Sequence, residues 1–161
     1  MLAMHAILHP TDFSDVSQHA FELAGSLARD TSARLIVLHV LQPPSLITYG
    51  EMERALEQAD GYRQELHQML HKLRLADLGA AIDYRLEEGE PAREILRAAA
   101  ETNCDLIVLG THGRTGFRRL LLGSVAEQVM RRADCPVLTV NRPVQESVPR
   151  SPVGSRAIVP V

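Results

Sequence analysis

Short apolar runs alternate along this chain with stretches of helical periodicity. Four of the runs are rich in Ile, Leu and Val without polar alternation, which is typical of strands covered on both faces. A fifth run alternates apolar and polar positions, and it predicts an edge strand with one solvated face. The predicted strands are Ala6–His9, Leu35–Val40, Ile82–Leu86, Leu106–Leu109 and Val137–Val140.

Helical patterns fill the intervals between these runs. Ser14 is placed to cap the first helix, and Pro91 fits the first position of the third. A longer second helix is predicted from about Glu51 to Leu75, although Gly61 weakens it by about 1 kcal/mol relative to Ala. The β-α alternation predicts one open, parallel, five-stranded α/β sheet with helices on both faces.

The segment between the last two strands carries the clearest chemical signal. Gly110 ends a strand where no side chain should block a ligand, and Gly113 permits close backbone approach or positive φ. Ser124 and Glu127 fit a capping box that starts the last helix, Ser124–Arg132. Backbone N–H groups and a helix N-terminus that converge in this way suit a phosphate chain. The alternative is that the glycines serve turn geometry alone.

Charged residues in this loop and after the first strand are further candidates for binding a phosphate-bearing ligand. Arg114, Arg118 and Arg119 lie in the loop, where they either neutralise phosphates or form a solvated cationic surface. Asp12 follows the first strand. Ligands of open α/β sheets bind beyond the carboxyl ends of strands, so Asp12 faces the glycine loop if the first and fourth strands are neighbours. Its carboxylate then accepts a ribose hydroxyl or shares a metal; the alternative is that it caps the first helix.

Composition narrows the class of protein. With 161 residues the chain is long enough for one sizeable core, and a formal charge of −3 gives no basic field toward nucleic acid or membrane. No apolar run reaches membrane-spanning length, and the start MLAMHAILHP lacks the basic residues of a signal peptide, so we expect a cytoplasmic protein. Cys104 and Cys135 lie beside apolar runs without metal-type spacing, and we expect two buried, reduced thiols.

Several site designs are disfavoured. His9, His39 and His112 fall at or after strand ends, but no pair has the helical spacing of a zinc motif. Neither G-x-x-x-x-G-K-[ST] nor a G-x-G-x-x-G after the first strand is present, which excludes the P-loop and dinucleotide designs.

The combined motifs resemble those of the universal stress protein family, in particular its ATP-binding subclass, over about residues 3–141. The resemblance rests on Ile7–Ser14, Leu38–Val40 and the closing strand Ala133–Leu138. It rests above all on the spacing Gly110-x-x-Gly113, then nine residues, then Gly123-Ser124. It implies a Rossmann-like, adenine nucleotide alpha hydrolase-like sheet of order 3-2-1-4-5.

The resemblance also implies a ligand and its site. The ligand is ATP or another adenine nucleotide, with Mg²⁺ or Mn²⁺ held through its phosphates and no metal ligand assigned to the protein. The backbone of Val40 reads the base and Asp12 the ribose, while Ala126 departs from a Thr found in some relatives. The implied nucleotide-binding residues are Pro10, Thr11, Asp12, Val40, Gly110, Thr111, His112, Gly113, Arg114, Gly123, Ser124 and Val125.

These implications define the expected organisation and function. Residues 1–141 form the nucleotide-binding domain, and residues 142–161 form a tail that is unstructured, or that packs on a neighbouring subunit or on the body of the domain. The leading hypothesis is a cytoplasmic, ATP-binding stress-response regulator; the alternatives are a slow ATPase or autophosphorylating enzyme, and a scaffold that binds AMP or no nucleotide. His112 is the one titratable group expected near the phosphates, because Asp12 is assigned to the sugar. A homodimer is expected through the last strand, at Pro136, Val137, Leu138, Thr139 and Val140.

Overall fold

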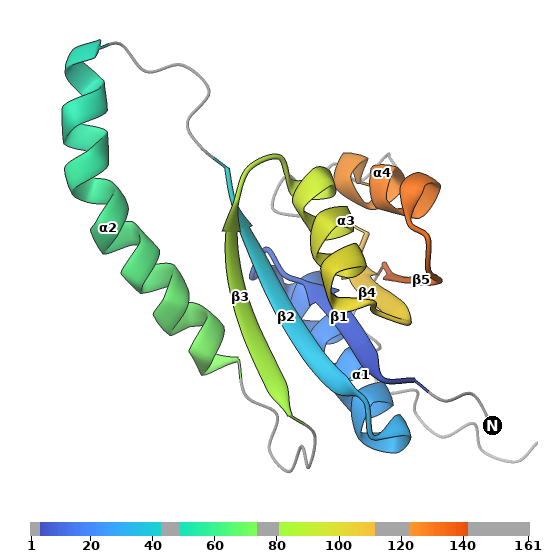
Figure 1. Cartoon of the computed structure of the whole chain (residues 1–161). Coiled ribbons are helices and arrows are strands. Elements are labelled where there is room, and N and C mark those ends of the chain that lie inside the picture. Colours follow the sequence, from blue (N-terminus) through green and yellow to red (C-terminus); the bar gives the residue numbers. More distant parts are fainter. Residues whose placement is uncertain (1–3, 43–48, 74–80, 112–122, 142–161) are drawn as a thin grey trace, which may run out of the picture.

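The chain forms a five-stranded parallel sheet of order β3-β2-β1-β4-β5, seen in the computed structural model of Figure 1. The structure describes residues 4–42, 49–73, 81–111 and 123–141. This sheet confirms the expected order, and the alternating run lies at its edge as predicted. The strands are β1 Ala6–Pro10, β2 Arg34–Leu41, β3 Ile82–Glu88, β4 Leu106–Gly110 and β5 Val137–Val140.

In the described part of the chain, helices cover both faces of the sheet. One face carries α3 and α4, and the other carries α1 (Figure 1). The helix α2 lies beside the edge strand β3, and its C-terminal end packs on the same face as α1. None of the helices in the described part is both long and apolar enough to cross a membrane. The helices are α1 Asp15–Thr31, α2 Tyr49–Lys72, α3 Pro91–Thr102 and α4 Ser124–Arg132.

Burial on both faces explains the non-alternating strands. The neighbours Ile7 and Leu8 in β1 are both fully buried, Ile7 in the cluster with α1 and Leu8 in the cluster with α3 and α4. Burying such a side chain contributes about 2 kcal/mol relative to leaving it exposed. The central strand therefore has no solvated face that would favour polar residues.

Two helix starts lie where the sequence places them. Ser14 is the N-cap of α1, and its hydroxyl accepts a hydrogen bond of 3.2 Å from the Ser17 amide. Pro91 is the first residue of α3, after an N-cap at Glu90 whose carboxylate accepts from two first-turn amides. Local chemistry is enough to begin both helices.

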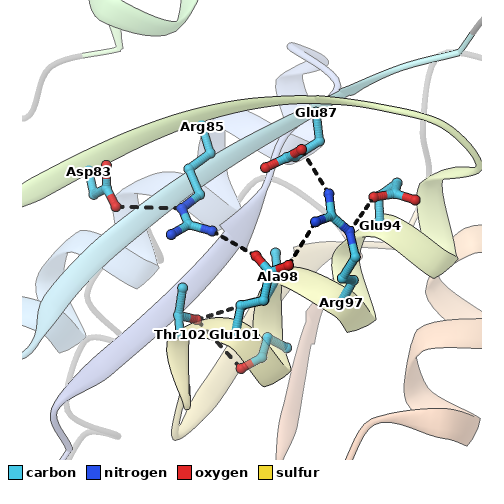
Figure 2. Close-up of polar contacts among 9 residues, drawn as sticks. Asp83, Arg85, Glu87, Glu94, Arg97, Ala98, Glu101 and Thr102 are labelled. Carbon is cyan, nitrogen blue, oxygen red and sulfur yellow. Dashed lines mark hydrogen bonds and ion pairs between the residues drawn. The ribbon is translucent and has the colours of Figure 1, made fainter.

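An ion-pair network joins the solvated side of β3 to α3 (Figure 2). Arg97 donates to Glu94 at 2.7 Å, to Glu87 at 2.8 Å and to Glu101 at 2.7 Å. Glu94 is buried, with a side chain only 5% exposed, whereas Glu101 is 44% exposed. The network therefore contains one carboxylate that depends on its partners for solvation.

We expect Glu94→Gln to destabilise the protein by about 1–2 kcal/mol, because a buried amide N–H₂ would replace a carboxylate oxygen that faces a guanidinium. Glu101→Gln is the matched control and should cost below about 1 kcal/mol, since its ion pair is solvated. Urea unfolding of the two variants measures the difference. Equal losses would show that burial of Glu94 does not set its contribution.

Candidate functional site

A cavity of about 470 Å³ lies at the carboxyl ends of β1, β2 and β4. These strands meet where the chain order reverses, which is where open α/β sheets bind ligands. The cavity brings together every predicted site residue that the structure describes: Pro10, Thr11, Asp12, Val40, Gly110, Thr111, Gly123, Ser124 and Val125. The predicted residues His112, Gly113 and Arg114, with Arg118 and Arg119, lie outside the described residues.

The turn after β1 is held by its own polar side chains. Asp12 Oδ1 accepts hydrogen bonds from the Ser14 amide at 3.0 Å and the Ser14 hydroxyl at 2.6 Å. Thr11 Oγ1 accepts from the Ser17 hydroxyl at 2.9 Å, and Phe13 has a left-handed φ of 62°. Asp12 therefore orders the start of α1 through Ser14, which is itself the cap, while its side chain also borders the cavity.

His39 in β2 fixes the same turn from the neighbouring strand. Its Nδ1–H donates to the Thr11 carbonyl at 2.7 Å, a contact that places the proton on Nδ1 because a carbonyl only accepts. Its ring also packs against Phe13, with centroids 4.6 Å apart. The sequence raises His39 only as a disfavoured metal ligand, whereas the structure makes it a support for the cavity wall. In the described ranges no three His, Cys, Asp or Glu side chains form a metal-sized group.

His9 lies just below the site, on the face of the sheet that α1 covers. Its Nδ1–H donates to the Val108 carbonyl at 2.9 Å, and its ring lies 5.7 Å from that of Phe21. Burial lowers the pKa of His9 to about 4, and the Val108 carbonyl and Asp12 only partly oppose this. Among the described residues Nε2 has no hydrogen-bond partner. His9 is therefore neutral near pH 7 and belongs to the core rather than to the cavity wall.

Gly110 has a packing reason that differs from the predicted one. An added Cβ would lie 3.0 Å from Val16 Cγ1 and 3.3 Å from the Ser17 amide, both in α1. Although Gly110 borders the cavity, its missing side chain makes room for α1 rather than for a ligand. The close approach brings the end of β4 against the first turn of α1.

Gly123 joins the start of α4 to the residue that follows β4. Its N–H donates to the Thr111 carbonyl at 2.6 Å, and an added Cβ would lie 2.7 Å from the same oxygen. Its φ of −69° is open to any residue, so space rather than backbone conformation requires glycine here. Thr111 is in turn anchored to the Val140 carbonyl by its amide at 2.8 Å.

The predicted capping box at Ser124 and Glu127 is wrong. The N-cap of α4 is Gly123, which makes no side-chain cap hydrogen bond, and Ser124 is already the first helical residue. The helix itself spans the predicted Ser124–Arg132, and the extended backbone of Gly123, held by its bond to Thr111, takes the N-cap position. The first turn of α4 thus borders the cavity, and its N-cap residue supplies no capping side chain.

Part of the cavity wall has no counterpart in the sequence prediction. Pro91 and Ile95 of α3 supply apolar surface, and Tyr62 of α2, 45% exposed, lies at the rim. No local motif marks these positions, because helices distant in sequence bring them to the site. The remaining lining residues are Ser17, Leu38, His39, Leu41, Gln42, Leu109 and Ala126.

These features define a doubly wound α/β protein with a ligand-sized cavity at the switch point of its sheet. The sequence profile of the Universal stress protein family matches residues 4–141. Universal stress protein MJ0531 of Methanocaldococcus jannaschii is 38% identical over 143 residues, which cover 87% of this chain and 84% of that protein. The chain therefore belongs to the universal stress protein family.

Solved structures of similar proteins show the same architecture. The structure of the hypothetical protein MJ0577 has a TM-score of 0.79 at 28% identity and covers 89% of this chain and 99% of its own. A universal stress protein in complex with cAMP has a TM-score of 0.58 at 26% identity, with 87% of this chain and 99% of that chain covered.

Proposed function

We propose that the protein binds an adenine nucleotide, foremost ATP, in this cavity and acts as a cytoplasmic stress-response regulator whose conformation or partners respond to the ligand. The observation that carries the proposal is the convergence on one cavity of residues from β1, β2, the end of β4 and the start of α4. These are the residues that the motif resemblance assigns to nucleotide binding. The family relative in complex with cAMP supports an adenine ligand.

The cavity has chemically different regions that match the parts of a nucleotide. Val40, Leu38 and Ile95 offer apolar surface to a base, and Asp12 borders the space beside them with a carboxylate suited to a ribose hydroxyl. Thr111, Gly123 and Ser124 border the space at the N-terminus of α4, where backbone amides and the helix dipole favour phosphate oxygens. We propose that Mg²⁺ or Mn²⁺ is held mainly by the phosphates, which it would neutralise.

Thermal unfolding with ATP, ADP, AMP, cAMP and GTP, each with and without Mg²⁺, tests the proposal. Ligand at a hundred times its Kd should add about 2.7 kcal/mol of stability and raise the Tm. We expect adenine nucleotides to exceed GTP, and ATP with Mg²⁺ to give the largest shift. No shift in Tm with any adenine nucleotide would contradict the proposal. A larger shift with cAMP than with ATP would show that the site does not select a polyphosphate chain.

We also propose that two copies pair through β5. This strand ends the sheet in the described part of the chain, and Leu138 on it is 37% exposed. Such an edge is a ready template for pairing with another strand.

We expect Leu138→Lys to convert the dimer to a monomer, because it places a charge on the proposed contact. Leu23→Lys is the matched control, since Leu23 lies on α1 and is 39% exposed. Light scattering coupled to size exclusion gives the mass of each variant. A monomeric unmodified chain, or a dimer that survives Leu138→Lys, would count against pairing through β5.

A further inference from the structure

Two cysteine sulfurs lie close together at the amino ends of β4 and β5, whereas the cavity lies at the carboxyl ends of the strands. Cys104 Sγ and Cys135 Sγ are 3.6 Å apart, and both thiols are free. Cys104 lies between α3 and β4, and Cys135 lies between α4 and β5. Cys104 therefore precedes β4, at whose carboxyl end the nucleotide is proposed to bind, and Cys135 follows α4, whose first turn borders the same cavity.

We propose that Cys104 and Cys135 form a reversible oxidation site, at which a hydroperoxide converts the two thiols into an intramolecular disulfide. The sulfurs are in contact, and a disulfide requires them to approach by a further ~1.5 Å, to about 2.05 Å. The sequence predicts two buried, reduced thiols; Cys104 is buried as expected, whereas Cys135 is only half-buried. Where intracellular proteins carry disulfides, these are usually transient and redox-sensing.

The surroundings of the two thiols define the order of the steps. Cys104 is buried with 7% of its surface exposed, and burial raises the pKa of its thiol to about 12, with the neighbouring Cys135 adding to the effect. Cys104 therefore stays protonated and is shielded from a dissolved oxidant. Cys135 is half-buried and is the accessible partner.

In the first step the Cys135 sulfur attacks the hydroperoxide. An S–O bond forms, the O–O bond breaks, and the products are a sulfenic acid on Cys135 and water or an alcohol. In the second step the Cys104 sulfur attacks the Cys135 sulfur. The S–S bond forms, the S–O bond breaks, and the departing oxygen leaves as water with the Cys104 proton. Overall the two thiols lose two electrons to the hydroperoxide, and a thiol reductant restores them by exchange.

The position of the pair gives the bond a structural consequence. The residues between Cys104 and Cys135 include β4, Gly123 and α4, so the disulfide would close the chain segment that bears much of the proposed nucleotide site. Cross-linking a segment of about 30 residues restricts the unfolded chain. The oxidised protein should therefore unfold several degrees above the reduced one.

Peroxide treatment of the full chain, followed by alkylation in denaturant and intact-mass analysis, tests the proposal. We expect the mass of the single, unmodified chain to fall by two hydrogens, because the disulfide forms within one chain. Both cysteines should then resist alkylation, and dithiothreitol should restore both thiols. Two alkylated thiols, a disulfide between two chains, or Cys135 oxidised to sulfinic acid without a disulfide would overturn the proposal.

Two single variants separate the roles of the cysteines. Cys104→Ser should accumulate a Cys135 sulfenic acid that dimedone traps, whereas Cys135→Ser should leave Cys104 unmodified at the same peroxide dose. Equal modification of Cys104 in the second variant would refute the assigned order. The ATP-induced thermal shift of both reduced variants should match that of the unmodified chain, which keeps this test independent of the proposed nucleotide site.

Discussion

Gly123→Ala is expected to weaken ATP binding by about 10- to 100-fold. The added Cβ would lie 2.7 Å from the Thr111 carbonyl oxygen, well inside normal contact distance. Gly123 must then move away from Thr111, and its 2.6 Å hydrogen bond is strained or lost. The displaced amides at the start of α4 should lose about 1.4–2.8 kcal/mol of binding free energy, since each 1.4 kcal/mol is about tenfold in Kd. Isothermal titration with ATP and Mg²⁺ measures the effect.

Gly61→Ala is the matched control for this substitution. An added Cβ at Gly61 in α2 would meet nothing within 4 Å. Alanine at an exposed helical position should stabilise the protein by about 0.5–1 kcal/mol and leave the Kd unchanged. If Gly123→Ala binds ATP as tightly as Gly61→Ala, the phosphates do not lie at the start of α4.

The free energy of unfolding should fall by about 3 kcal/mol through His9 alone as the pH drops from 6.5 to 4. His9 has a pKa of about 4 in the fold, against 6.5 as its ordinary value, because it is completely buried. The unfolded chain therefore binds more protons than the folded chain between these values. The contribution is fully present above pH 6.5 and is lost progressively toward pH 4. Urea unfolding at a series of pH values measures the slope.

His9→Asn isolates this contribution from other acid-sensitive groups. The asparagine amide can replace the Nδ1–H donor to the Val108 carbonyl, and it does not titrate. The variant should be less stable at pH 7 but should show a shallower pH dependence below pH 6.5. A His9→Asn slope identical to that of the unmodified chain would show that His9 does not titrate with the expected low pKa.

Local patterns were enough to predict most of the framework. The strand and helix positions follow from runs and periodicities of a few residues, because burial on one or two faces selects side chains at those spacings. Ser14 and Pro91 mark helix starts through chemistry confined to one turn. The glycine spacing around Gly110 and Gly123 was specific enough to indicate the family, and the sequence profile confirms that indication.

The sequence by itself thus determined the elements and their order along the chain, and its resemblance to the family supplied the set of residues proposed to bind nucleotide. Only the tertiary structure decided that Gly110 admits α1, that Gly123 rather than Ser124 caps α4, and that Tyr62 reaches the cavity rim. It alone placed Cys104 against Cys135. The physical reason is the range of the interactions: periodicity and capping act within a few residues, whereas close contacts join segments whose separation in space is set by the packing of the whole sheet and its helices.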